Sequence, residues 1–108
     1  MISSTEITNS GLTEEEIQNI QDIFSQYNSV EQVLLYGSRA IGSFKPASDI
    51  DLCMKGINLN LTIQQEIETD LDDLLLPYKI DLSIYHKITN PNFKEHIDRV
   101  GKELYTKT

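Results

Sequence analysis

The sequence predicts a small α/β domain with helices packed on a short mixed sheet, in the order α-β-β-α-β-α. Apolar residues recur at helical spacing in three segments, and three other segments are apolar runs of strand length. The chain has 108 residues, of which 39% are hydrophobic and 24% are charged, and these values are ordinary for one globular domain. We therefore expect a single domain over residues 12–108, preceded by a flexible, polar N-terminus over residues 1–11.

The N-terminal part of the domain is predicted to hold a helix and then a strand. Thr13 and Glu16 have the spacing of a capping box, which satisfies two free amides at the start of a helix. Apolar residues then recur every three or four positions, at Ile17, Ile20, Phe24 and Tyr27. This spacing predicts a helix over residues 13–28. The apolar run of residues 30–36, which ends at Gly37, predicts the first strand.

The middle of the domain is predicted to hold a second strand and a second helix. The run of residues 49–55 is mostly apolar and has the length of a strand. Thr62 and Gln65 have the spacing of another capping box, and apolar residues follow at helical spacing. We expect this helix to continue to residue 76 and to end before Pro77, because proline interrupts a helix interior.

The C-terminal part is predicted to hold a third strand and a last helix. Residues 78–85 alternate between apolar and polar side chains, as a strand with one buried face does. Asn90-Pro91 then combines a capping residue with a proline in the first turn, where its missing amide is tolerated. The apolar stripe of the last helix is expected at Phe93, Ile97, Val100 and Leu104.

The charge of the chain disfavours one class of partner. Nine Lys and Arg residues oppose seventeen Asp and Glu residues, for a net charge of −8. A protein that holds a long nucleic-acid strand usually presents a basic face, so we expect no stable nucleic-acid polymer as a partner. No apolar run approaches the ~20 residues of a membrane span. The single cysteine, Cys53, is expected to be a partly buried structural thiol, and the chain to be cytoplasmic.

The strongest functional signal is a Gly-Ser turn combined with three aspartates. Gly37 and Ser38 follow the first predicted strand, where a glycine lets the backbone approach a phosphate. Asp49 and Asp51 are separated by one residue in the second predicted strand, so their side chains share a face, and Asp81 lies in the third. Clustered carboxylates repel each other unless a cation lies between them, and Mg²⁺ prefers such oxygen ligands. The pattern predicts a metal-dependent nucleotide site.

These residues resemble the motifs of the nucleotidyltransferase superfamily typified by DNA polymerase beta, and most closely those of its minimal nucleotidyltransferase branch. The matching segments, within residues 30–105, are Gly37-Ser38-Arg39-Ala40 with Gly42, Ser48-Asp49-Ile50-Asp51-Leu52, and Lys79-Ile80-Asp81-Leu82. One position departs from the pattern, because Ile41 stands where many members carry a second basic residue. The resemblance implies the small nucleotidyltransferase fold.

The resemblance also implies a role for each matching residue. Asp49 and Asp51 would bind both of two Mg²⁺ ions, and Asp81 would bind only the second ion and help to deprotonate the acceptor. The phosphates of ATP, the substrate, would be held by three residues: Gly37, Ser38 and Arg39. The implied reaction is in-line attack of a hydroxyl on the α-phosphate, in which two metal ions stabilise the charge on the entering and leaving oxygens.

Minimal members of the superfamily often pair with a small helical HEPN protein in a toxin–antitoxin module. By this resemblance, we expect the chain to transfer AMP from ATP to a tyrosine of a HEPN ribonuclease toxin and thereby to act as its antitoxin. A domain of this size has little room for its own acceptor-binding module, which agrees with an acceptor on a partner. Two alternatives stay open: adenylylation of a small molecule such as an aminoglycoside, and neutralisation of a partner by binding alone.

Overall fold

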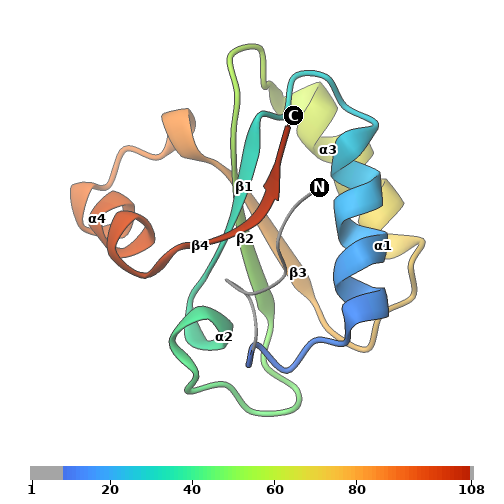
Figure 1. Ribbon diagram of the computed structural model, residues 1–108. Coiled ribbons are helices and arrows are strands. Elements are labelled where there is room, and N and C mark those ends of the chain that lie inside the picture. The colour runs from blue at the N-terminus through green and yellow to red at the C-terminus, as the bar shows by residue number, and fades with distance from the viewer. Residues whose placement is uncertain (1–8, 108) are drawn as a thin grey trace.

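The structure is a computed structural model that describes residues 9–107; residues 1–8 and 108 lie outside the described part. Its elements are α1 (Glu14–Ser25), β1 (Gln32–Tyr36), α2 (Ser38–Ile41), β2 (Ile50–Lys55), α3 (Leu61–Asp72), β3 (Ile80–Ile84), the 3₁₀ turn η2 (Tyr85–Lys87), α4 (Pro91–Val100) and β4 (Lys102–Thr106). The sheet forms the middle layer, with α1 and α3 on one face and α4 on the other (Figure 1). The predicted fold class is confirmed.

The four strands form one mixed sheet in the order β3-β2-β1-β4. β1 pairs antiparallel with β2 and with β4, whereas β2 and β3 run parallel. The parallel pair requires a crossover connection, which α3 supplies. The three predicted strands are confirmed as β1, β2 and β3, each slightly shorter than expected. The expected order of elements, α-β-β-α-β-α, lacks β4, and this fourth strand is the largest difference between the prediction and the structure.

β4 takes the place of the last turn of the expected final helix. Leu104 has helical spacing from Val100, but α4 ends at Val100, and Gly101 then has extended backbone with φ −60° and ψ 135°. Leu104 is fully buried in the strand instead. The edge of β1 offers backbone hydrogen-bond partners to a whole strand. If residues 101–104 formed one more helical turn, those backbone groups of β1 would stay unpaired. Tertiary pairing therefore outweighs the helical spacing of the apolar residues.

The bounds of α3 also differ from those expected. The N-cap is Asn60, whose side-chain oxygen accepts a first-turn amide at 2.9 Å, so the capping box expected at Thr62 and Gln65 is wrong. Asn is at least as good an N-cap as Thr, and it comes earlier in the chain. The helix ends at Asp72, several residues before the expected end. Leu75, just beyond it, has left-handed backbone with φ 55°, which continues no helix.

The other two predicted helix starts are confirmed. The side chain of Thr13 accepts the amide of Glu16 at 3.0 Å, and the side chain of Glu16 accepts the amide of Thr13 at 2.9 Å. Asn90 caps α4 by accepting two first-turn amides, and Pro91 is the first residue of that helix. Short-range side-chain chemistry therefore decides where both helices begin.

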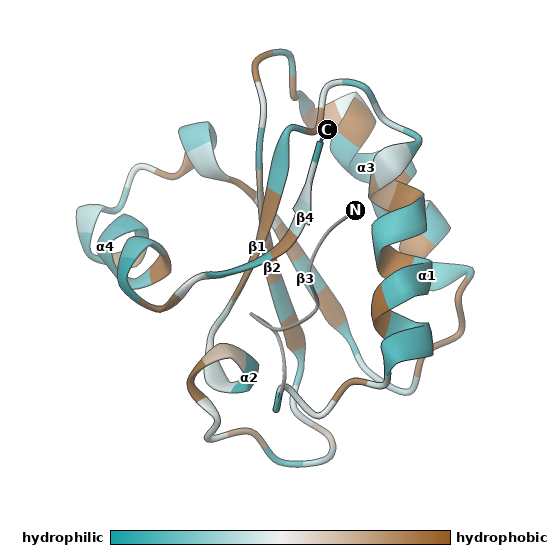
Figure 2. Ribbon diagram, in the orientation of Figure 1, coloured by the Kyte–Doolittle hydropathy of each residue, from teal (hydrophilic) through white to brown (hydrophobic). Residues whose placement is uncertain are grey.

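The hydrophobic core lies mainly between the sheet and the helix pair α1 and α3. Among its fully buried side chains are Ile20, Phe24, Leu35, Leu52 and Ile67. A smaller cluster of buried residues lies beneath α4: Tyr36, Cys53 and Ile97. Figure 2 shows hydrophobic residues along the strands and hydrophilic residues on the outer side of α1. The two faces of the sheet are therefore unequal, and the α4 face has the smaller apolar cluster.

Cys53 has no exposed surface. Burial raises the pKa of its thiol to about 11, so the reactive thiolate is scarce near neutral pH. The expected burial of Cys53 is confirmed, and it is complete where the sequence predicted only partial burial.

Within residues 9–107, no helix combines the length and the apolar character needed to cross a membrane. Of the N-terminal segment expected to be flexible, residues 1–8 lie outside the described part. Ser10, in the same segment, is buried with 2% of its surface exposed, so the folded body begins before residue 12.

Candidate active site at one end of the sheet

Two of the predicted site aspartates lie side by side on neighbouring strands. Asp51 of β2 and Asp81 of β3 are direct partners in the parallel register. On its other side, Asp51 is the direct partner of Tyr36 of β1. Direct partners project from the same face of a sheet, so these three side chains form a row across it. The row lies on the face that α4 covers, because Tyr36 belongs to the cluster beneath that helix.

Asp49 lies one residue outside β2, which begins at Ile50. The expectation that Asp49 lies within the strand is therefore wrong. The amide of Ile50 donates to the carbonyl of Lys79 at 2.8 Å, so the pairing with the next chain segment starts directly after Asp49. Asp49 and Asp81 are both exposed, whereas Asp51 is half-buried. The aspartates thus lie at and just before the N-terminal ends of two parallel strands.

The pKa of the Asp51 carboxyl is raised above its ordinary value. Burial is the largest cause, followed by the negative charges of Asp81 and Asp49, while His96 acts in the opposite direction. A raised pKa means that the ionised carboxylate costs free energy in the folded state. A cation between the carboxylates would remove that cost.

Among the residues that the structure describes, no three His, Cys, Asp or Glu side chains are gathered closely enough to hold a metal ion. The chemistry of the donors nevertheless fits Mg²⁺, because three carboxylates provide oxygen ligands. Asp51 and Asp81 are already cross-strand neighbours. Asp49 and Asp81 are exposed, so their side chains have room to change rotamer toward Asp51. The residues present therefore fit a divalent cation.

Gly37 brings the turn after β1 into contact with Asp51. Its backbone has φ 76° and ψ −157°, a conformation that is essentially restricted to glycine. A Cβ at this position would collide with Oδ2 of Asp51. Glycine is therefore required both for the backbone conformation and for the close approach of the carboxylate.

Ser38 is the first residue of α2, a single helical turn. The carbonyl of Gly37 accepts the amides of Ala40 and Ile41 at 3.1 and 3.2 Å. Gly42 then ends the turn in left-handed backbone with φ 86°. Ser38 is partly exposed, so its hydroxyl is available to a ligand at the end of β1.

Arg39 is buried, with 2% of its surface exposed. Its guanidinium donates to three backbone carbonyls: Ser10 at 2.8 Å, Ser48 at 2.9 and 3.1 Å, and Pro46 at 3.2 Å. The rings of Phe44 and Tyr78 lie 5.1 and 4.5 Å from its central carbon, which are favourable cation–π distances. This buried arrangement differs from the phosphate contact expected from the sequence.

The contacts of Arg39 place it in a supporting position. Ser48 directly precedes Asp49, so a hydrogen bond to the Ser48 carbonyl fixes the chain next to that aspartate. The bond to Ser10 ties the same loop to the N-terminal segment. Arg39 therefore holds the loop that leads from α2 to Asp49.

His96 is a residue of this region that no sequence pattern indicated. It lies on α4, and its ring meets the ring of Tyr36 edge-on with the centroids 6.1 Å apart. Its charge lowers the pKa of the Asp51 carboxyl. The chain contains one other histidine, His86, without metal-ligand spacing to it, and the packing of α4 against β1 is not visible in a linear sequence.

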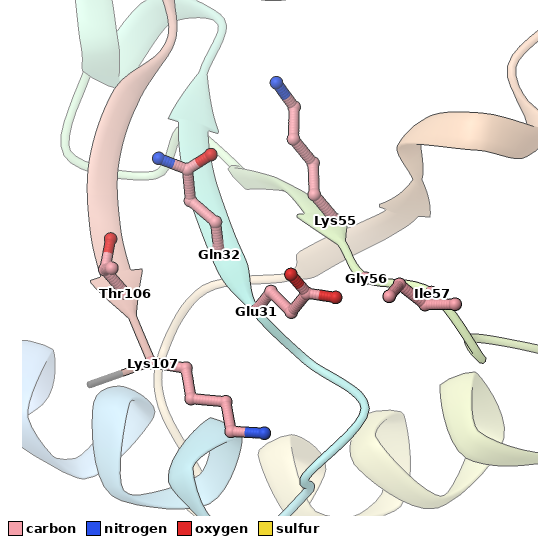
Figure 3. A pocket seen from close by; sticks show the side chains of 7 residues that line it. All are labelled: Glu31, Gln32, Lys55, Gly56, Ile57, Thr106 and Lys107. Carbon is pink, nitrogen blue, oxygen red and sulfur yellow. The ribbon is translucent and has the colours of Figure 1, made fainter.

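A large open hollow of about 630 Å³ lies at the other end of β1 and β2 (Figure 3). Its lining residues are Glu31, Gln32, Lys55, Gly56, Ile57, Thr106 and Lys107. Gln32 begins β1 and Tyr36 ends it, so the hollow and the aspartate row are separated by the length of the strand. The hollow is therefore not part of the candidate active site.

Solved structures of toxin–antitoxin complexes share this fold. A toxin–antitoxin crystal structure with AMP-PNP matches over 90% of this chain and 76% of the matched chain, with 20% identity and a TM-score of 0.68. The toxin–antitoxin pair MntA–HepT matches over 88% and 74%, with 16% identity and a TM-score of 0.66. A tri-AMPylated Shewanella oneidensis HEPN toxin in complex with MNT antitoxin matches over 89% and 74%, with 16% identity and a TM-score of 0.67. At these identities the likeness establishes the fold.

The sequence itself establishes the family. Among curated proteins, none matches the chain significantly. The family model described as "Polymerase beta, Nucleotidyltransferase" matches residues 18–108, a span that contains all four strands, the Gly37-Ser38 turn and the three aspartates. The chain belongs to the polymerase beta nucleotidyltransferase family.

Proposed function

We propose that this chain is a metal-dependent nucleotidyltransferase that moves AMP from ATP to a tyrosine of a partner HEPN ribonuclease toxin and thereby acts as its antitoxin. The observation that carries the proposal is the pairing of Asp51 with Asp81 beside the Gly37 turn, in a chain of the nucleotidyltransferase family. Because the turn and the Asp51 carboxylate are in contact, phosphates held by the turn would lie next to cations held by the aspartates.

The proposed ligands of two Mg²⁺ ions are Asp49, Asp51 and Asp81, with Asp49 and Asp51 shared by both ions. When bound, Mg²⁺ supplies positive charge that stabilises the entering and leaving oxygens of an in-line displacement. The raised pKa of Asp51 supports this assignment, because burial and two neighbouring negative charges disfavour its ionised form in the absence of a cation.

The other steps depend on the residues of the chain. Gly37 and Ser38 present backbone amides and a hydroxyl to the terminal phosphates of ATP. Asp81 lies on the far side of Asp51 from β1, so the acceptor hydroxyl is expected there. Its proton passes toward the Asp81 carboxylate, and its oxygen forms a bond to the α-phosphorus. The bond from that phosphorus to the bridging oxygen of the β-phosphate breaks, and pyrophosphate leaves.

For Arg39 we propose an indirect part in nucleotide binding. Its guanidinium is already hydrogen-bonded to carbonyls, including that of Ser48. It would therefore support the site by fixing the loop before Asp49 rather than by contacting phosphate.

The similar structures support both ATP as the donor of AMP and a HEPN toxin as the partner. One contains AMP-PNP, an analogue of ATP, and another is a complex of an MNT antitoxin with a tri-AMPylated HEPN toxin. The net charge of −8 favours association with a basic partner protein. The same charge makes a nucleic-acid strand an unfavourable acceptor.

The direct test is the mass of the partner. A candidate HEPN-family partner would be co-expressed with wild type, with Asp49→Asn and with a control, Asp22→Asn. Asp22 lies on α1, on the opposite side of the sheet from α4. Its carboxylate accepts a hydrogen bond from the side-chain amide of Gln18. We expect intact-mass spectrometry to find one or more added AMP units with wild type and Asp22→Asn, and none with Asp49→Asn.

Two results would replace this proposal. A partner of unmodified mass that wild type and Asp49→Asn neutralise equally would favour an antitoxin that acts by binding alone. Transfer of AMP to an aminoglycoside, with none to the HEPN protein, would favour a small-molecule adenylyltransferase.

A further inference from the structure

The short helix α2 does not present a positive charge to the proposed triphosphate site. Arg39 is buried and hydrogen-bonded to backbone carbonyls. Ile41 is the exposed residue of this helix, at 56%, and it is apolar. Bound phosphates are usually held by charge-assisted hydrogen bonds from cationic side chains. In addition to the donors of Gly37 and Ser38, a further side-chain donor for the triphosphate is therefore expected from another element.

Helix α4 covers the face of the sheet that carries the aspartate row. The row of side chains runs from Asp81 through Asp51 to Tyr36, and Gly37 follows Tyr36 directly in the chain. His96 of α4 lies against the ring of Tyr36. Its imidazole therefore lies beside the last side chain of β1, and it is close enough to Asp51 to act on the pKa of that carboxyl.

The helix holds His96 in this place through its neighbours. Phe93 packs edge-on against Tyr36 with the ring centroids 5.5 Å apart, and Ile97 is fully buried. His96 itself is partly exposed, so a ligand can reach it. An imidazole carries at least one N–H in either protonation state. It can therefore donate to a phosphate oxygen whatever its charge.

We propose that His96 contacts the triphosphate of the bound nucleotide and supplies the hydrogen-bond donor that Arg39 does not. The inference rests on the proposed nucleotide site and adds to it a residue from α4, on the opposite face of the sheet from α1 and α3 (Figure 1). It also explains why an apolar Ile41 is tolerated beside that site.

The test measures nucleotide affinity and does not require transfer. Calorimetry would give the Kd of a non-hydrolysable ATP analogue with Mg²⁺, and separately that of adenosine. The main variant is His96→Phe, which keeps an aromatic ring against Tyr36 but removes the N–H. His96→Gln restores a donor without a ring. The matched control is His86→Phe, an exposed histidine on η2.

We expect His96→Phe to raise the Kd of the ATP analogue about tenfold, because the loss of one hydrogen bond to a charged group has an effect of this size. Adenosine affinity and the melting temperature should stay close to those of wild type. His96→Gln should lie between wild type and His96→Phe, and His86→Phe should match wild type.

Three outcomes would overturn the inference. The Kd of the analogue could be unchanged in His96→Phe, or His96→Phe could lose affinity equally for the analogue and for adenosine. In the third outcome, Lys45→Ala loses affinity for the analogue and His96→Phe does not. The last would move the donor to the loop before Asp49. If wild type binds the analogue but transfers AMP to no acceptor, the proposed function fails while the inference on His96 is still decided by affinity. If wild type binds no analogue, both fail.

Discussion

Two carboxylates on different strands of the sheet, Asp51 on β2 and Glu103 on β4, respond to their surroundings in opposite ways. The pKa of Asp51 is raised, mainly by burial and then by two neighbouring aspartates. The pKa of Glu103 on β4 is lowered, because the side chains of Thr106 and Gln32 donate hydrogen bonds to it. The folded protein therefore stabilises the negative charge of Glu103 and disfavours that of Asp51.

This difference separates a structural carboxylate from one that is available to a ligand. Glu103 is already satisfied, and its partners Gln32 and Thr106 line the large hollow of Figure 3. Asp51 keeps an unfavourable charge. It lies next to Gly37, where glycine is required by the close approach of the Asp51 carboxylate and by the backbone conformation. Proteins commonly lose stability at functional sites in this way. Charge and backbone conformation therefore mark the candidate site, whereas the size of a hollow does not.

The largest expected effect is on catalysis at the aspartate end. Asp51→Asn and Asp49→Asn should each lower AMP transfer by about 100-fold or more, because each removes a ligand of the proposed metal ions. Glu103→Gln should leave transfer close to wild type. The measurement is transfer of label from α-labelled ATP to the partner. Full activity in Asp49→Asn would contradict the two-metal assignment.

The next effect is on stability, through the residue that holds the loop before Asp49. Arg39→Leu should lower the free energy of unfolding by on the order of 3 kcal/mol, because it leaves buried carbonyls without donors. The control is Arg99→Leu, whose side chain pairs with Glu95 on the surface with both more than 60% exposed. That change should cost less than about 0.5 kcal/mol. Urea unfolding compares the two, and equal losses would show that Arg39 is not a structural support.

A smaller effect, opposite in sign, is expected when the charge of Asp51 is removed. Its folded-state pKa lies above the ordinary 3.8, so the ionised carboxylate costs stability above that folded-state pKa. The cost falls as the pH drops below the folded-state pKa, and it is gone below the ordinary value of 3.8. Asp51→Asn should therefore raise the melting temperature of the metal-free protein slightly at pH 7, and the gain should shrink on acidification. Added Mg²⁺ should stabilise wild type more than the variant. A lower melting temperature for Asp51→Asn at pH 7 would contradict the assignment.

The smallest effect is expected at the satisfied carboxylate. The folded-state pKa of Glu103 lies below the ordinary 4.5, so its contribution to stability is present above 4.5 and is lost as the pH falls through the folded-state value. Glu103→Gln should therefore be less stable than wild type at pH 7, with a difference that closes in acid. Glu66→Gln, at an exposed residue of α3, serves as the control. A pH-independent difference would mean that packing, and not charge, is responsible.

The sequence by itself determined the local features of this protein. The starts of α1 and α4 follow from side chains that bond amides within one turn, and such bonds depend only on neighbouring residues. The apolar runs of β1, β2 and β3 and the motif around Gly37, Asp49 and Asp51 were visible for the same reason. These features were sufficient to indicate the fold class and the family.

Only the tertiary structure decided the non-local features. β4 forms because the edge of β1 is free to pair with it, which the helical spacing of Leu104 concealed. The strand register sets Asp81 and Tyr36 on either side of Asp51. Burial turns Arg39 toward backbone carbonyls, and the packing of α4 brings His96 to the end of β1. Each of these contacts joins residues far apart in the chain, and its free energy comes from burial and pairing that no local pattern encodes.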